Sequence, residues 1–128
     1  MYMLAKTFRF SASHQLLQVA EDHPCRRLHG HNYTVTVVLS AESTDAVTGM
    51  IVDYHDLAPL KSYIAAHLDH RHLNDVSLLN GSEPTAENLA HCLYEWCHLN
   101  CVWGPLVTTV YVSETADTFA AFTEGSSL

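Results

Sequence analysis

The sequence predicts an α+β fold in which a four-stranded antiparallel sheet carries two helices on one face. The predicted order along the chain is ββααββ. Alternating apolar and polar residues mark two segments near the start of the chain and two near its end, a pattern typical of half-buried strands. Between these two pairs lie two segments with apolar residues at helical spacing.

The strand predictions depend on residues of equal parity. Leu4, Phe8 and Phe10 share one face of the first strand, and Tyr33 and Val35 share one face of the second. These two strands should pair as an antiparallel hairpin with a long polar loop, of the kind that often carries function. The expected strands cover residues 4–12, 31–40, 107–113 and 118–122, and the end of the chain, 123–128, is expected to fray.

The helix boundaries follow from proline, threonine and glycine. Pro59 is tolerated in a helix only within the first turn, so the first helix should start near Asp56. Thr85 can cap the second helix, and Gly104 with the proline after it should end that helix. With 128 residues, no repeat and no linker, the chain is expected to form a single domain over residues 1–128.

Composition excludes several classes of protein. The formal net charge of −8 argues against nucleic acid as a partner, because a phosphate backbone requires a basic surface. No apolar run approaches the ~20 residues of a membrane span, so we expect no membrane partner. Residues 1–10 do not resemble a signal peptide, which favours a cytoplasmic protein whose four cysteines are free thiols.

Three histidines are predicted to meet at one end of the sheet. His29 and His31 continue the apolar face of the second strand, and His14 continues that of the first. If the two strands pair, the three imidazoles lie together on the same side. Three histidines with a fourth position left open are typical of a catalytic zinc site.

Other candidate groups leave two interpretations open. Cys25 lies in the polar loop, where it is either an inert thiol or a reactive thiolate favoured by nearby positive charge. Asp69 precedes His70, as in an acid–base pair, although sequence neighbours need not touch. Glu114 ends the third strand, where a carboxylate is either solvated or able to accept two parallel N–H donors.

Six segments carry a family resemblance over nearly the whole chain. In order they are FSASH, CRRLHGHNY, GMIVDYHDL, LDHRHLN, PTAENLA and VSETADTFAAF. In order and spacing they resemble the 6-pyruvoyltetrahydropterin synthase/6-carboxytetrahydropterin synthase family. The resemblance implies the tunnelling fold (T-fold) and a homo-oligomer with active sites at subunit interfaces. It also implies the small-molecule substrate 7,8-dihydroneopterin triphosphate.

The same resemblance assigns roles to individual residues. It implies Zn²⁺ held by His14, His29 and His31. It makes Cys25 the proton acceptor and His70, with Asp69, the other proton-transfer group, while Glu114 anchors the pterin and Thr85 is a weaker contact.

Two reactions compete within the family. The short spacing of three residues between Cys25 and the HGH motif resembles the 6-carboxytetrahydropterin synthases of queuosine biosynthesis, which release acetaldehyde and triphosphate. The alternatives are a 6-pyruvoyl-type synthase or a dihydroneopterin-cleaving relative. A non-catalytic zinc- or pterin-binding module is the alternative from another class, but such a module would have no need of Cys25 and the Asp69–His70 pair.

Overall fold

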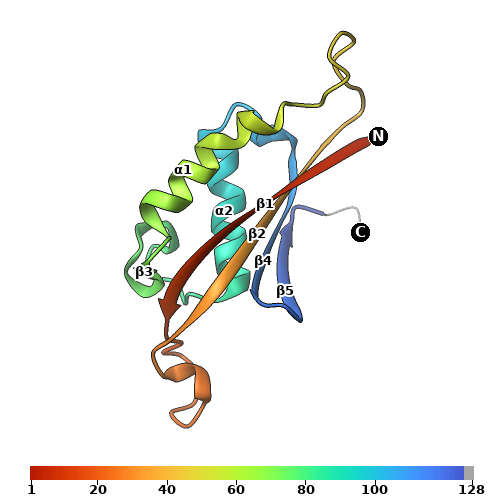
Figure 1. The fold of residues 1–128 in the computed structure, drawn as a ribbon. Helices are drawn as coiled ribbons and strands as arrows, with labels where there is room; N and C mark the ends of the chain where they lie inside the picture. Colours follow the sequence, from red (N-terminus) through yellow and green to blue (C-terminus); the bar gives the residue numbers. More distant parts are fainter. Residues whose placement is uncertain (126–128) are drawn as a thin grey trace.

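The computed structural model describes residues 1–125, and in this range the chain forms an α+β fold (Figure 1). Two helices, α1 (Ala58–His67) and α2 (Ala86–Asn100), lie on one face of a sheet. The strands are β1 (Tyr2–His14), β2 (His29–Ala41), β3 (Arg71–His72), β4 (Val107–Thr115) and β5 (Thr118–Thr123). The segment 123–128 was expected to fray. Thr123 is the last residue of β5, residues 124 and 125 follow it without regular structure, and residues 126–128 lie outside the described residues.

The sheet has the order β3-β1-β2-β4-β5, so the prediction of four strands is wrong by one. The four predicted strands form antiparallel neighbours, as expected. The additional strand, β3, pairs with β1 in parallel through only two residues, Arg71 beside Ala12 and His72 beside Ser13. A two-residue strand is too short to show an alternating pattern, and its partner lies far away in the sequence.

The core lies between the sheet and the helices. Strands β1, β2 and β4 contribute mainly residues of one parity, and each helix contributes one stripe, as the apolar spacing predicted. The buried side chains include Phe8, Phe10, Tyr33, Val35, Val37, Val110 and Val112 from the sheet and Leu57, Leu60, Ile64, Leu89, Leu93 and Cys97 from the helical segments.

Caps define where the helices begin. A 3₁₀ turn at Tyr54–Leu57 precedes α1 and is capped by Asp53, so α1 itself starts at Ala58, slightly later than predicted. The Thr85 hydroxyl oxygen accepts a hydrogen bond from the Asn88 backbone N–H at 3.1 Å, which confirms it as the cap of α2.

Beyond α2, Gly104 packs directly on the end of the helix. A Cβ atom at this position would lie 2.2 Å from the carbonyl oxygen of Cys97, closer than any real contact. The absence of a side chain at Gly104 therefore allows the chain to turn tightly from α2 into β4.

The loop between β1 and β2 extends beyond one end of the sheet (Figure 1, orange). It contains a short 3₁₀ turn, Pro24–Arg26. The Arg26 guanidinium donates hydrogen bonds to the carbonyl oxygens of Leu17 and Val19, at 2.8 and 2.9 Å, and so ties the two halves of the loop together. Within residues 1–125, neither helix is long and apolar enough to cross a membrane.

Candidate metal centre and active site

Strand register brings the three predicted histidines together. His14 pairs with His29 at the end of the β1–β2 ladder, and His31 pairs with Ala12 two residues earlier. Because all three side chains project from the same face of the sheet, one nitrogen from each lies within 4.8 Å of the others. His14 is buried, while His29 and His31 are half-buried. The predicted clustering of these three side chains is therefore present in the structure.

The hydrogen bonds of two imidazoles fix their tautomers. Nδ1 of His14 lies 2.7 Å from the carbonyl oxygen of Pro84, and Nδ1 of His29 lies 2.7 Å from the carbonyl oxygen of Arg27. A carbonyl oxygen only accepts hydrogen bonds, so each neutral ring must carry its proton on Nδ1. The two Nε2 atoms then present bare lone pairs to each other across 2.9 Å. Two facing lone pairs repel unless a cation or a proton lies between them.

His31 completes the same arrangement. Its Nε2 atom is buried and has no hydrogen-bond partner among residues 1–125. Burial lowers the pKa of His31, Glu114 opposes this effect, and the neighbouring His14 and His29 reinforce it. A neutral imidazole with a free, buried nitrogen is suited to ligate a metal. The three residues therefore fit a bound metal ion, and we name them the histidine triad.

A second set of contacts supports the triad. The Tyr33 hydroxyl lies 3.3 Å from Nδ1 of His14, and its ring stacks on Phe10 with 4.9 Å between centroids. Such outer contacts hold metal-ligating rings in orientation. The carbonyl groups of Pro84 and Arg27 were not predictable, because a backbone carbonyl has no sequence signature. The hydroxyl of Tyr33, within the HNY motif, was a signal that could have been used.

Glu114 is the predicted carboxylate closest to the triad. Its Oε2 lies 3.5 Å from Nε2 of His31, longer than a hydrogen bond but within ion-pair distance. The β4–β5 ladder shifts register between Val112 and Thr115, so Glu114 lies in an irregular part of the strand. It also lines a cavity of about 210 Å³ together with Glu87 and the exposed Phe119. This position allows the carboxylate to face a ligand bound beside the triad.

Asp69 and His70 lie together, and both are held by Ser11 on β1. The Ser11 N–H donates to Oδ1 of Asp69 at 2.9 Å, and the His70 N–H donates to the Ser11 carbonyl at 2.7 Å. We name these two hydrogen bonds the Ser11 clamp. Asp69 Oδ2 and His70 Nε2 are 3.6 Å apart, so the pair is close without forming a hydrogen bond.

The backbone of His70 is unusual, with φ at 59°. A non-glycine residue in this left-handed region costs about 1–3 kcal/mol. The Ser11 clamp holds the backbone in this conformation, and the His70 side chain remains 83 % exposed. His70 therefore presents its imidazole to solvent or to a ligand from a fixed position.

The structure places Cys25 and Thr85 outside the triad. Cys25 is half-buried in the 3₁₀ turn of the loop, and its sulfur is not among the ligand atoms that cluster within the described residues. Its backbone N–H donates to Nδ1 of His23 at 3.0 Å. Thr85 caps α2 directly after Pro84, the residue whose carbonyl orients His14.

Comparison with known proteins gives the class to which this fold and site belong. The family model described as 6-pyruvoyl tetrahydropterin synthase matches residues 3–125. The chain therefore belongs to the 6-pyruvoyl tetrahydropterin synthase family, as the sequence motifs predicted.

Individual relatives carry two different names. The chain is 34% identical to a 6-carboxy-5,6,7,8-tetrahydropterin synthase from Synechocystis, over 95% of this chain and 93% of that protein. It is 30% identical to a 6-pyruvoyl tetrahydrobiopterin synthase from Drosophila melanogaster, over 88% of this chain and 73% of that protein. The solved structure of the Caenorhabditis elegans 6-pyruvoyl tetrahydropterin synthase superimposes with a TM-score of 0.85 at 26% identity, covering 95% of this chain and 94% of that one. This likeness confirms the predicted T-fold.

Proposed function

We propose that this protein is a zinc-dependent 6-carboxy-5,6,7,8-tetrahydropterin synthase acting in queuosine biosynthesis. It would convert 7,8-dihydroneopterin triphosphate and one water molecule into 6-carboxytetrahydropterin, acetaldehyde and triphosphate. The observation that carries the proposal is the histidine triad with Glu114 beside it, in a chain that is 34% identical to a synthase of that name. A 6-pyruvoyl-type synthase is the alternative, because a relative of that name is 30% identical.

The histidine triad would hold the zinc ion. Three neutral imidazole donors, two with their tautomers fixed by backbone carbonyls, match the ligand set of a catalytic zinc site with an open position. A zinc ion held there would act as a Lewis acid that polarises the side-chain oxygens of the substrate and makes the adjacent C–H acidic.

Two groups of the chain are proposed to move protons. Cys25, as thiolate, would accept a proton from the substrate side chain, and His70 would exchange the second proton. His70 is suited to this task because its imidazole is exposed while the Ser11 clamp fixes its backbone. Asp69, 3.6 Å from His70 Nε2, would stabilise the protonated imidazole electrostatically.

The pterin ring is proposed to lie beside Glu114. The edge of a pterin presents parallel N–H donors, which a carboxylate can accept with both oxygens. Thr85 is the weaker contact. Its oxygen already accepts the Asn88 N–H, so it can still donate its hydroxyl hydrogen and accept one more hydrogen bond.

Association of identical chains is part of the proposal. Within residues 1–125, β5 pairs only with β4, and β1 meets β3 over only two residues. Open strand edges of this kind favour pairing with another chain, which supports a homo-oligomer with sites near the subunit interfaces. We also propose the cytoplasm as the compartment, since its reducing conditions suit four free cysteines.

Product analysis tests the proposed reaction. Purified zinc-loaded protein is incubated with 7,8-dihydroneopterin triphosphate, and the products are identified by mass spectrometry with aldehyde trapping. We expect acetaldehyde and triphosphate to form in equal amounts. Triphosphate with a pyruvoyl pterin and no acetaldehyde would assign the alternative reaction. Binding of zinc and pterin without any turnover would show a non-catalytic module.

Replacing Glu114 by glutamine tests the pterin anchor. Gln keeps one carbonyl oxygen but replaces the second acceptor by a donor, so a pterin analogue should bind about 10- to 100-fold more weakly, as expected for loss of a charged hydrogen bond. Zinc content should not change. Asp117→Asn removes the same charge from the exposed β4–β5 turn and should bind the analogue normally. Unchanged affinity in Glu114→Gln, measured by calorimetry, would refute the anchor role.

A further inference from the structure

The loop that joins His14 to His29, residues 15–28, carries Cys25, and we name it the Cys25 loop. Its two ends lie at the histidine triad, because His14 and His29 are members of the triad. Its two halves are bonded to each other, since the Leu16 N–H donates to the Cys25 carbonyl oxygen at 2.8 Å. The position of Cys25 thus depends on the position of the residues that follow His14.

Two side chains outside the loop fasten its first half to the rest of the protein. Asn74 pairs with the backbone of Gln15, accepting its N–H at 3.0 Å and donating to its carbonyl oxygen at 2.8 Å. Glu83 accepts the N–H of Leu17 with one carboxylate oxygen and that of Gln18 with the other, each at 3.1 Å. Four hydrogen bonds from two side chains therefore hold this half of the loop.

The second half of the loop, which contains Cys25, has no such tie of its own. In the described part of the chain, no other hydrogen bond joins residues 15–26 to a residue outside the loop. The remaining hydrogen bonds of this segment stay within the loop. Because Cys25 is bonded to Leu16, its place in the protein depends on the fastening of the residues next to Leu16.

Glu83 makes the stronger of the two attachments. An ionised carboxylate that accepts backbone N–H groups forms charge-assisted hydrogen bonds, which are roughly twice as strong as neutral ones. The side-chain amide of Asn74 is neutral. Glu83 is half-buried, and none of the ion pairs within residues 1–125 includes it. No cationic side chain therefore competes with the two N–H groups for its oxygens.

The backbone of Glu83 is held separately from its side chain. Its carbonyl oxygen accepts the Thr85 N–H and the Asn88 side-chain amide, both at 2.9 Å. The next residue, Pro84, places its carbonyl oxygen 2.7 Å from Nδ1 of His14. The segment before α2 thus contacts both a member of the histidine triad and the Cys25 loop. Replacing only the Glu83 side chain should leave the contact with His14 in place.

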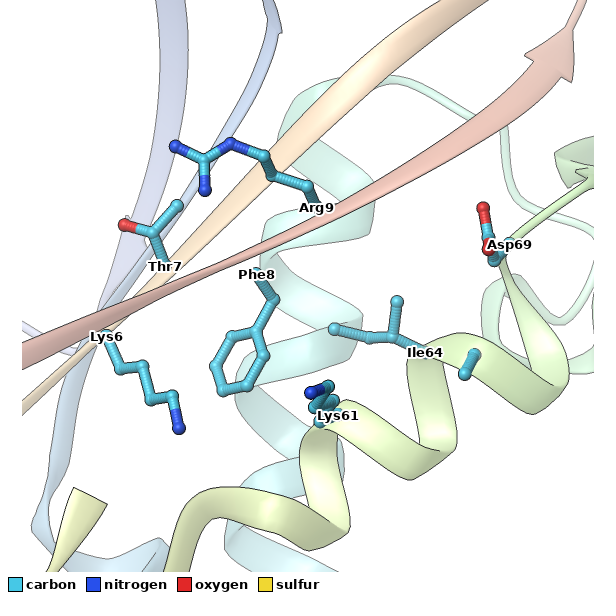
Figure 2. A pocket seen from close by; sticks show the side chains of 8 residues that line it. Lys6, Thr7, Phe8, Arg9, Lys61, Ile64 and Asp69 are labelled. Carbon is cyan, nitrogen blue, oxygen red and sulfur yellow. The ribbon is translucent and has the colours of Figure 1, made fainter. Parts of the chain in front are cut away.

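A carboxylate holds the backbone on each side of His14. Asp69 accepts the N–H of Ser11, three residues before His14, at 2.9 Å, and Glu83 accepts the N–H of Leu17, three residues after it. Figure 2 shows Asp69 beyond the end of α1 and near the end of β1. On one side the tie fixes a strand, whereas on the other it fixes the start of the loop that leads to Cys25.

We propose that Glu83 is a positioning residue that holds the Cys25 loop in place beside the histidine triad. This assignment rests on the proposed function, in which Cys25 accepts a proton from the substrate. Glu83 acts through the backbone of Leu17 and Gln18, which fixes the half of the loop to which Cys25 is bonded. A general base works only within reach of the proton that it removes, and a misplacement of about 1 Å can cost about 10²-fold in rate.

Hydrogen exchange of single amides, followed by NMR, tests the tie without any turnover. In zinc-loaded Glu83→Gln the amides of Leu17 and Gln18 should exchange about tenfold faster than in the wild type, because Gln keeps one acceptor oxygen and no charge. The amide of Val35, in the core of the sheet, should exchange as before. Glu21→Gln removes the same charge from an exposed position in the Cys25 loop and should exchange like the wild type.

Turnover tests the positioning role. In Glu83→Gln the kcat for 7,8-dihydroneopterin triphosphate should fall about tenfold or more, because the general base is less well placed. The KM and the zinc content should stay within about twofold of the wild type, since Glu114 and the histidine triad keep their contacts. Glu83→Ala, which removes both acceptor oxygens, should lower kcat further, and Glu21→Gln should keep the wild-type kcat.

The two measurements separate the possible outcomes. Unchanged exchange at Leu17 and Gln18 in Glu83→Gln would overturn the tie. Faster exchange with a wild-type kcat would overturn the positioning role, as would an equal loss of kcat in Glu21→Gln. Faster exchange in Glu83→Gln, in a protein that makes no pterin product even as wild type, would support the tie and refute the proposed reaction.

Discussion

His29→Ala is expected to lose nearly all of its bound zinc. The triad supplies three protein ligands and leaves no redundant donor, so a zinc site of about one ion per chain should fall to a small fraction after dialysis against a weak chelator. His29 is the best position for this test because it is half-buried, whereas His14 is only 1 % exposed and its replacement would also open the core. Zinc is measured by mass spectrometry of the metal, and folding by circular dichroism.

The control for this variant is His55→Ala. The His55 side chain is 95 % exposed and contacts Asp53, away from the triad. We expect this variant to keep its full zinc content and its activity. Full zinc in His29→Ala, with the fold intact, would show that the metal is held elsewhere or that the triad binds none.

Chelation of wild-type protein should also lower its thermal stability. One nitrogen of each ring lies within 4.8 Å of the others, and a bound cation removes the repulsion between the His14 and His29 Nε2 atoms, which face each other at 2.9 Å. A ligand that binds only the folded state stabilises it in proportion to the logarithm of its concentration over Kd. The melting temperature of His29→Ala should therefore not respond to added zinc, while that of the wild type should rise.

Cys25→Ala should retain zinc and lose about 10²–10⁴-fold in turnover, the usual contribution of a positioned general base. The thiol is half-buried in the β1–β2 loop, and the loop is held in shape by Arg26 and by the bond from the Leu16 N–H to the Cys25 carbonyl oxygen at 2.8 Å. These backbone contacts do not involve the sulfur, so removing it should leave the loop unchanged. A variant with a near-normal rate would make Cys25 an inert loop residue.

The other thiols provide the matched control. Burial raises the pKa of Cys92, Cys97 and Cys101, and that of Cys97 reaches about 12. A thiol with a raised pKa forms little thiolate near neutral pH and reacts slowly. Iodoacetamide should therefore modify Cys25 first, and activity should fall in step with that single adduct. Cys92→Ala should keep the wild-type rate.

Strand parity was sufficient to predict the histidine triad. His14, His29 and His31 each continue an apolar face, and an antiparallel ladder forces such faces together whatever the details of the loop. The cap at Thr85 was predictable from local geometry as well. A threonine hydroxyl just before a helix accepts a hydrogen bond from one of the free backbone N–H groups of the first turn. Both predictions depend on regular backbone geometry, namely the alternation of side chains along a strand and the free N–H groups at the start of a helix.

The features that were not predictable involve backbone groups and distant partners. β3 is two residues long, and it forms because residues 71 and 72 meet the end of β1 after α1 has turned the chain back. The carbonyl groups that orient His14 and His29 come from Pro84 and Arg27, and any residue type can supply a carbonyl. The hydrogen bond from the Ser11 N–H to Oδ1 of Asp69 was also not predictable, because its two partners lie 58 residues apart in the sequence.

The Ser11 clamp has a consequence for the rim of the sheet. In an antiparallel ladder, alternate residues direct both backbone groups away from their partner strand, and Ser11 directs its own toward Asp69 and His70. The same groups of Arg9, Thr7, Ala5 and Met3 point outward along β1. A strand from another chain added there could run beside residues 2–10, a length of roughly 30 Å. It would have to stop at Ser11, where the outward-facing groups are already taken. The Ser11 clamp would therefore end such a pairing at Ser11, and the last residue of the docked strand would lie next to His70.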